Sequence, residues 1–363
     1  MSSQNLPPDF QRQSYVFELP QERIAQFPAK ERQASRLLVI DRAKKTLTHT
    51  SFSAIANYLP KNAILVANNS KVVPARLCGT RETGGKFEFL LLTPLPLLEK
   101  SPIDQAGFAH CVCLGLVRQG GRVVPGQELK ISEDLKITIL ELGSFGKHRC
   151  KLSFRGDLET LFTRFGKVPL PPYIKREPDT VDLTRYQTVY AKEPGSVAAP
   201  TAGLHFTKEL QASLVALGFT WLELTLFVGY GTFSPVRSND IREHTMHSEY
   251  IEISADVAQT ITLAKAQGRP IIAIGTTSVR ALEGAYKACG RLEAFAGWTD
   301  IFLYPGKKVQ VIDGLVTNFH LPGSSLIMLV ASLVGRQRLL EIYQEAIAKQ
   351  YNFFSYGDAM LIL

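Results

Sequence analysis

The segment Glu193-Pro-Gly-Ser-Val-Ala-Ala-Pro-Thr-Ala-Gly-Leu-His-Phe-Thr207 lies just past the middle of the chain and is unusual for a loop. Two prolines and two glycines interrupt it, so neither a regular helix nor a regular strand can run through it. From residue 195 to residue 207 it has no charged side chain, apart from any charge on His205. We expect such an apolar segment to be packed as a wall against a ligand, because glycine lets the backbone approach closely.

His205 lies just before Thr207, which is the predicted N-cap of a helix over residues 208–217 that ends at Gly218. An ionisable ring at the junction of a loop and a helix is typical of an active site. It is equally typical of a structural histidine, so this feature alone leaves both interpretations open.

The composition is that of a globular protein with a modest excess of positive charge. The chain has 363 residues, a length typical of two domains, and a net charge of +8 at pH 7. This charge favours a polyanionic partner such as nucleic acid, although many globular proteins are equally basic. Five scattered cysteines, no secretory signal and no apolar run of membrane-spanning length predict a cytoplasmic protein without membrane association. We expect residues 1–14 to form a disordered tail.

Apolar runs alternate with helical periodicity over most of the chain, which is typical of an α/β fold. From Arg76 to about Phe154 the pattern changes to short β-type runs separated by glycine-rich turns, which favours a small antiparallel barrel. The sequence therefore predicts a three-layer α/β/α main domain, formed by residues 15–75 and 156–363, with an inserted antiparallel β-barrel domain over residues 76–155. We expect a helix over residues 182–190, a strand over residues 299–304, and an apolar C-terminus that docks in the core.

Three further loops carry polar groups that could hold a ligand. Asn68 and Asn69 follow a buried strand, and their amides could read a base edge or form an ordinary turn. Residues 228–236 form a glycine-rich loop after another strand. Gly275-Thr-Thr-Ser278 opens a helix, where N–H groups and hydroxyls suit a carboxylate or a phosphate. This loop lacks the lysine of a P-loop and the spacing of a dinucleotide fingerprint, so neither ATP nor NAD is indicated.

Some cations and histidines also have two interpretations. Arg36 at a strand entrance could contact phosphate, and Lys175 and Arg176 follow an aromatic residue, Tyr173, as in sites that stack on and screen a nucleic-acid strand. Ordinary surface charges and a proline-rich connector explain the same residues. The run His244-Thr-Met-His-Ser-Glu249 could suggest metal ligands, but its spacing is not that of a metallohydrolase, and the sequence predicts no metal.

Eight segments, taken in order, resemble the motifs of one family, the S-adenosylmethionine:tRNA ribosyltransferase-isomerases of queuosine biosynthesis. They span nearly the whole chain and leave out the tail and much of the inserted domain. Each motif is unspecific alone, whereas the ordered set is highly specific. The segments are residues 34–39, 69–76, 195–207, 228–236, 244–250, 275–283, 317–322 and 354–363.

The resemblance implies that the ribosyl group of S-adenosylmethionine is transferred to 7-aminomethyl-7-deazaguanine at the wobble position of a tRNA with a GUN anticodon. The product would be epoxyqueuosine-tRNA, with adenine and methionine released. S-adenosylmethionine is then a consumed co-substrate, and no metal and no obligate protein partner are implied. Phe227 stands where the family is expected to have His, which removes that position from the candidate acid–base groups.

Within the matching motifs, the chemistry requires general acid–base groups, which histidines and perturbed carboxylates supply. We expect Thr276, Thr277 and Arg280 to hold the methionine carboxylate or the ribose, and Asn68 and Asn69 to contact the base or nearby RNA. The candidate catalytic residues are His205, His247, His320, Glu249 and Asp300. The candidate substrate-binding residues are Asn68, Asn69, Pro200, Thr201, Gly203, Gly229, Gly231, Thr232, Thr276, Thr277, Arg280 and Asn318. The candidate RNA-binding residues are Arg36, Lys71, Arg76, Lys175 and Arg176.

Two alternatives stay open from the residues themselves. The basic charge and the β-barrel insertion would also suit a non-catalytic RNA-binding protein. The same loops would suit a purine-base glycosyltransferase. Against a pure binder, several uncharged loops with Thr, Gly and His are predicted to converge on one crevice, which binding alone does not require.

Overall fold

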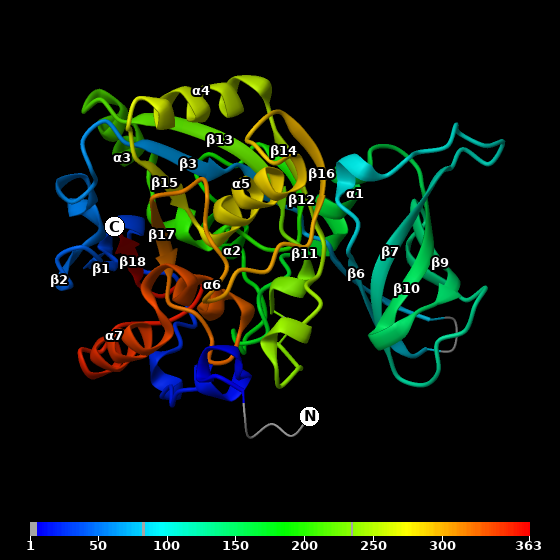
Figure 1. Cartoon of the computed structure of the whole chain (residues 1–363). Helices are drawn as coiled ribbons and strands as arrows, with labels where there is room; N and C mark the ends of the chain where they lie inside the picture. Colours follow the sequence, from blue (N-terminus) through cyan, green and yellow to red (C-terminus); the bar gives the residue numbers. More distant parts are fainter. Residues whose placement is uncertain (1–5, 82–83, 234) are drawn as a thin grey trace.

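The structure of the chain, a computed structural model, describes residues 6–81, 84–233 and 235–363. Figure 1 shows a large body in which helices surround a twisted sheet, with a smaller β-sheet at its side. The smaller sheet comes mainly from residues 76–154, between two parts of the chain that form the large body.

The main sheet has strands of mixed direction. Its strands lie in the order β16 (Phe295–Thr299), β14 (Glu249–Ile253), β13 (Thr220–Phe227), β3 (Ile64–Asn68), β15 (Ile271–Ile274), β17 (Gly314–Asn318), β18 (Ala359–Ile362), β1 (Arg36–Asp41) and β2 (Thr46–Ser51). The four neighbours β13, β3, β15 and β17 are parallel. Their carboxyl ends therefore meet at one edge of the sheet, where ligands of α/β folds usually bind.

Both faces of this sheet are buried. One face packs against α4 (Ala255–Ala266), α5 (Thr276–Cys289), α6 (Ser325–Val334) and α7 (Arg336–Ala348). The other face packs against α3 (Lys208–Ala216) and the 3₁₀-helix η6 (Phe52–Asn57). Burial on both sides explains why β3 is apolar without alternation. The mixed α/β class predicted from the sequence is confirmed, whereas the regular three-layer α/β/α arrangement is not.

The smaller sheet is antiparallel throughout. Its strands lie in the order β11 (Gly166–Lys167), β5 (Arg76–Thr80), β6 (Lys86–Leu91), β7 (Ala109–Gln119), β10 (Lys147–Phe154), β9 (Leu135–Leu142) and β8 (Glu128–Ser132). The sheet curls so far that a Cβ on Gly79 of β5 would lie 2.8 Å from the carbonyl oxygen of Lys130 in β8. The expected small barrel is thus a curled half-barrel with its own core, and α1 (Leu158–Phe165) packs against it.

The C-terminus docks in the core, as predicted, because β18 lies between β17 and β1 with every residue buried. The prediction that residues 1–14 form a disordered tail is wrong for part of that segment. Residues 8–10 and 12–15 form short 3₁₀-helices, and Asp9 pairs with Arg336 at 2.9 Å. The fully buried Tyr15 ring anchors this segment. Residues 1–5 lie outside the described part of the chain.

Two predicted elements differ from the structure. The helix expected over residues 182–190 is only α2 (Asp182–Arg185), because the chain turns at Tyr186 to bury that ring. The strand expected over residues 299–304 is wrong, since β16 ends at Thr299. Just beyond it, the Ile301 carbonyl accepts a hydrogen bond from the Arg280 side chain instead of joining a strand ladder.

Candidate active site

A cavity lies at the edge where the four parallel strands end. The free space in it, counted out into the open mouth and the solvent there, is about 640 Å³. Six separate parts of the chain line it. The lining residues are Tyr173, Ala198–Ala202, Val228, Thr232, Gly275–Thr277, Thr317–Leu321, Ser324, Leu326, Phe354 and Ser355.

The segment 193–207 forms one wall of this cavity. It begins as a short strand, β12 (Glu193–Ser196), which pairs in parallel with β4 (Ser70–Val72). The hydroxyl of Ser196 donates to Ser70 at 2.8 Å and accepts from the Val228 N–H at 2.9 Å. The Val197 N–H also donates to the Val228 carbonyl at 3.0 Å, so the wall is fixed to the next loop. It ends in the 3₁₀-helix η9 (Thr201–His205) before the predicted N-cap, Thr207, which caps α3.

His205 lies behind this wall rather than in the cavity. Its ring packs 4.9 Å from the Phe52 ring, between centroids, and is 4 % exposed. Its Nδ1 lies 2.7 Å from the Ser35 hydroxyl and its Nε2 lies 3.0 Å from Nδ2 of Asn318. Burial first, and the nearby Arg32 charge second, lower the pKa of His205 to about 3, so the ring is neutral.

Asn318 connects His205 to the cavity. Its Nδ2 also donates to the Phe354 carbonyl at 3.0 Å. This contact fixes the orientation of the amide, because a flipped amide would place two oxygens against each other. The Oδ1 atom is buried and has no hydrogen-bond partner within the described chain. A buried amide oxygen without a partner requires a donor, and the cavity is where a bound molecule could supply one.

The N-terminus of α5 forms the opposite side. Gly275 has a φ of 90°, a left-handed value that turns the chain sharply from β15 into the helix. Thr276 and Thr277 follow at the cavity, and the Thr277 hydroxyl oxygen is buried without a hydrogen-bond partner among the described residues. The helix start therefore presents backbone donors and a hydroxyl, which suits an anionic or hydroxylated group.

A buried ion pair supports the loop over residues 229–232. The Glu249 carboxylate pairs with Arg280, and both side chains are nearly inaccessible. The same carboxylate accepts from the Gly229 N–H at 2.9 Å and from the Thr232 hydroxyl at 3.0 Å. Arg280 is thus engaged by protein groups, and the geometry does not leave its guanidinium free for the methionine carboxylate as expected from the sequence. The His247 ring lies directly against Gly231, where a Cβ would be 2.3 Å away.

His320 does line the cavity. Its Nε2 lies 2.8 Å from the Thr317 hydroxyl, and its backbone N–H donates to the Tyr343 hydroxyl at 3.0 Å. Burial lowers the pKa of His320 to about 3, which keeps this imidazole neutral as well.

Acidification should destabilise the fold through His320. The pKa of this histidine rises from about 3 to 6.5 when the chain unfolds, so the unfolded state binds more protons between these values. The contribution of neutral His320 to the free energy of unfolding is therefore fully present above pH 6.5 and is lost as the pH falls toward 3. The free energy of unfolding falls by about 1.4 kcal/mol per pH unit in that range. Urea unfolding of the wild type and of His320→Gln between about pH 7.5 and about pH 5 checks this. A shallower pH dependence is expected for the variant, and identical slopes would contradict it.

Several predicted residues are not at the cavity. The Asn68 amide is buried and exchanges hydrogen bonds with the backbone of Leu226, so it holds β3 and β13 together and cannot read a base. Asn69 accepts from the Thr225 hydroxyl at 2.8 Å. Asp300 is exposed and pairs with Lys287 at 3.6 Å, away from the cavity. Gly203 lies behind the wall, against the Tyr190 hydroxyl.

Most of the predicted RNA-binding cations are occupied by protein groups. The Arg36 guanidinium lies over the Tyr351 ring and donates to the Lys349 carbonyl. Arg176 binds the buried Asp182 carboxylate through two hydrogen bonds. Lys71 pairs with Glu159 and Arg76 pairs with Glu177, while Lys175 is exposed. Only the exposed cations of this set remain available to a polyanion.

The sequence did not single out some lining residues as ligand-binding. They are Leu321, Ser324, Phe354 and Ser355, which lie in or beside two of the family-like motifs. One signal is visible only in the backbone: Phe354 has a φ of 71°, which is uncommon outside glycine. That conformation turns its carbonyl toward Asn318.

Residues 6–81, 84–233 and 235–363 contain neither a cluster of metal-binding side chains nor a membrane-spanning helix. No group of three or more His, Cys, Asp or Glu side chains in that part of the chain is arranged to hold a metal ion. None of its helices has the length and apolar character needed to cross a bilayer.

Comparison with known proteins gives a consistent result. The family model described as "Queuosine biosynthesis protein" matches residues 12–362. The S-adenosylmethionine:tRNA ribosyltransferase-isomerase of Nitratidesulfovibrio vulgaris (strain DP4) is 54% identical over 98% of each chain. The relative of the same name from Oleidesulfovibrio alaskensis is 53% identical, over 100% of this chain and 95% of its own. The crystal structure of the S-adenosylmethionine tRNA ribosyltransferase from Thermotoga maritima is 34% identical, covers 96% of this chain and 99% of its own, and superposes with a TM-score of 0.54.

Proposed function

The chain belongs to the queuosine biosynthesis protein family, and on that basis we propose how its cavity serves an S-adenosylmethionine:tRNA ribosyltransferase-isomerase. The reaction transfers and isomerises the ribosyl group of S-adenosylmethionine onto 7-aminomethyl-7-deazaguanine at the tRNA wobble position. Epoxyqueuosine-tRNA forms, and adenine and methionine leave. S-adenosylmethionine and the tRNA are both substrates in this scheme.

The observation that carries this proposal is the character of the cavity wall. Among the described lining residues there is no Asp, Glu, Lys or Arg side chain, but there are several hydroxyls and one amide. An uncharged polar wall can hold a cationic sulfonium without pairing it, and can receive an amine that must be neutral to attack. The buried oxygens of Thr277 and Asn318, which have no partner in the described chain, supply acceptors for ribose, adenine or amine N–H and O–H groups.

The residues divide into two kinds by position. His320 lines the cavity as a neutral imidazole, so we assign it the acid–base role beside the ribosyl group. His205 and Glu249 do not line the cavity, and we assign them positioning roles, on Asn318 and on the loop over residues 229–232 respectively. His247 supports the same loop, and Asp300 has no part in this chemistry.

The release of free adenine tests the function. The protein is incubated with S-adenosylmethionine and with tRNA that carries the aminomethyl base, and adenine is measured together with the mass of the modified nucleoside. Adenine with an epoxyqueuosine-containing tRNA is expected. A non-catalytic RNA-binding protein would release no adenine, and a purine-base glycosyltransferase would release adenine with an unmodified nucleoside.

Thr277→Ala should weaken binding of S-adenosylmethionine. The variant removes one of the two buried oxygens without a partner in the described chain, and the loss of one hydrogen bond to a ligand corresponds to roughly a tenfold rise in KM for S-adenosylmethionine. The KM for tRNA should stay near the wild-type value. Thr277→Ser, which retains the hydroxyl, is the matched control. An unchanged KM in Thr277→Ala would remove Thr277 from the binding site.

The tRNA with a GUN anticodon, a cytoplasmic location and the lack of an obligate protein partner stay predictions from the sequence. The domain boundaries at residues 75–76 and 155–156 are likewise a proposal. A fragment over residues 76–155 would lack β11, which pairs with β5 from beyond the end of the insertion.

A further inference from the structure

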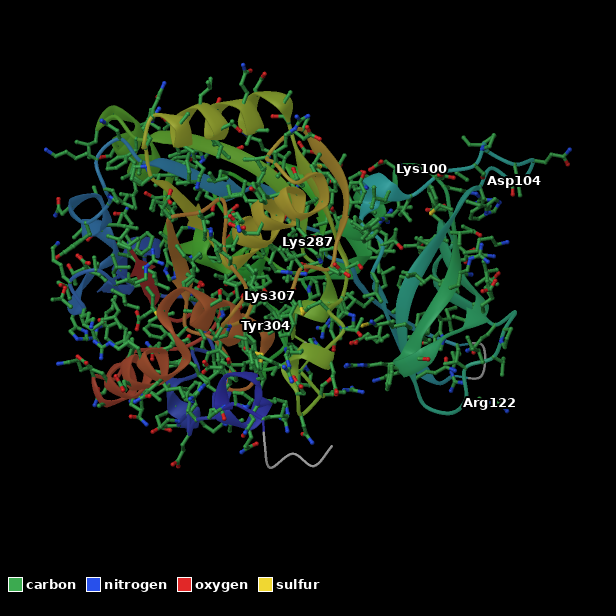
Figure 2. The ribbon with its side chains drawn as sticks, viewed as in Figure 1. Lys100, Asp104, Arg122, Lys287, Tyr304 and Lys307 are labelled. Atoms are coloured by element: carbon green, nitrogen blue, oxygen red, sulfur yellow. The ribbon has the colours of Figure 1, made fainter. Side chains whose placement is uncertain are left out.

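A second hollow, which we call the basic groove, lies beside the cavity. It is formed by the C-terminal half of α5, by residues 242–246 and by the irregular segment after β16. Figure 2 shows Lys287, Tyr304 and Lys307 on this face of the large body, with Lys100 and Arg122 on loops of the smaller sheet. Nothing in the chemistry assigned to the cavity uses the basic groove.

Aromatic rings run along the basic groove in contact with one another. The His244 ring lies edge-on to Phe302 at 5.3 Å, and Phe302 lies 5.1 Å from Tyr304, between centroids. The Lys307 ammonium lies 5.5 Å from the Tyr304 ring centre. Tyr304 is only 9 % exposed and supports the floor, whereas the half-buried Phe302 ring is placed where a base of a single strand can stack beside cations.

The charge of the basic groove is positive. Four cations, Arg242, Lys287, Lys307 and Lys308, face two carboxylates, Asp300 and Glu283. The Glu283 carboxylate is occupied by the backbone N–H groups of residues 310, 311 and 312, so it shapes the floor of the groove.

The two lysines of the irregular segment are the most available of these cations. Arg242 is bound by Asp240 outside the groove, and Lys287 pairs loosely with Asp300. Lys307 and Lys308 are both exposed, and neither forms an ion pair with any part of the chain that the structure describes. These two ammonium groups can therefore bind phosphates without first breaking a salt bridge.

The basic groove adjoins the cavity through one short segment. Thr245 and Met246 line the groove, and the next residue, His247, lies against Gly231. Thr232, which follows Gly231, lines the cavity. A strand whose target base enters the cavity could therefore continue into the groove with its neighbouring nucleotides.

We propose that the basic groove binds the single-stranded nucleotides of the anticodon loop that flank the wobble base, with Lys307 and Lys308 on their phosphates and the Phe302 ring against a base. This inference rests on the proposed function, because it takes the RNA as the substrate of the neighbouring cavity. The groove fixes the position of the RNA, and the cavity performs the chemistry.

The double variant Lys307→Ala/Lys308→Ala tests this proposal. The probe is an anticodon stem–loop RNA that carries the aminomethyl base, and its Kd is measured by fluorescence anisotropy at several salt concentrations. We expect the Kd to rise roughly tenfold and the salt slope to fall by about 1.4, which is about 0.7 for each lost phosphate contact on a single strand. In steady-state assays the KM for RNA should rise, while kcat and the KM for S-adenosylmethionine should stay near wild type.

Lys100→Ala/Arg122→Ala is the matched control, because it removes the same two charges from exposed loops of the smaller sheet. This control should keep the wild-type Kd and salt slope. Wild-type RNA binding by the groove variant, or an equal loss in both variants, would overturn the proposal while leaving adenine release intact. If the wild type releases no adenine, the function fails, but the anisotropy result still decides whether the groove binds RNA.

Discussion

Asn318→Ala is expected to lower kcat by about 10²–10³, the usual effect of removing one preorganised polar group from a reaction site. Asn318 is 2 % exposed, and its amide is held by His205 and by the Phe354 carbonyl. This leaves Oδ1 as an acceptor in a fixed position at the cavity. The substitution removes the acceptor and also leaves His205 Nε2 without its donor. Adenine release under saturating S-adenosylmethionine measures the loss.

Two further variants separate this role from a merely structural one. Asn57→Ala removes an exposed asparagine of η6 and should behave as the wild type. His205→Ala leaves Oδ1 and the hydrogen bond to Phe354 in place but removes the second acceptor that holds the amide, so its activity should lie between the wild type and Asn318→Ala. If His205→Ala is fully active while Asn318→Ala is inactive, the positioning role of His205 is wrong. If Asn318→Ala retains wild-type turnover, the assignment of the cavity fails with it.

The sequence predicts the place of the site better than its internal contacts. The segment 193–207, the loop after β13 and the start of α5 were each recognisable because glycine, proline and hydroxyl residues follow or precede apolar runs. Parallel strands then bring such loops to one edge of the sheet, which requires only strand direction. The lining of the cavity by the loop after β13 and by the start of α5 follows from that topology, whereas the segment 193–207 is placed by the pairing of β12 with β4 outside the main sheet.

What the sequence could not provide is which polar groups satisfy each other. Ser35 and His205 are 170 residues apart, and Asn318 lies another 113 residues beyond His205. Arg280 was expected to hold the methionine carboxylate or the ribose because it lies near the start of a helix, beside Thr276 and Thr277. Its partner, Glu249, lies on β14, and only the packing of α5 on that strand brings the two together. Such pairings depend on side-chain positions in three dimensions, which local patterns do not encode.

The packing of Phe227 could not be predicted from the sequence either. The resemblance marked it as a departure at a position where a histidine was expected. In the structure the ring is buried against Gly195, where a Cβ would lie only 2.8 Å from it. Gly195 has a φ of 155°, so both space and backbone favour glycine there. The ring therefore fills the space behind the wall.

Glu249→Ala should destabilise the protein by about 3–5 kcal/mol, because it leaves the Arg280 charge buried without a partner. That is a large part of the total stability of roughly 5–15 kcal/mol that is typical of folded domains. The same change removes the acceptor for the Gly229 N–H and the Thr232 hydroxyl, so the loop at the cavity should lose its fixed position. Denaturant unfolding measures the first effect, and KM for S-adenosylmethionine at a temperature well below unfolding measures the second.

The exposed pair Arg338–Glu341 on α7 provides the control, since both side chains are solvent-accessible and 3.2 Å apart. Glu341→Ala should change the free energy of unfolding by less than about 1 kcal/mol, because water already solvates both charges. The double variant Glu249→Met/Arg280→Leu should recover most of the stability lost by Glu249→Ala, since it removes the unpaired charge as well as its partner. It should not recover activity, because methionine offers no acceptor to the Gly229–Thr232 loop. Recovery of both would mean that the ion pair stabilises the fold without positioning the site.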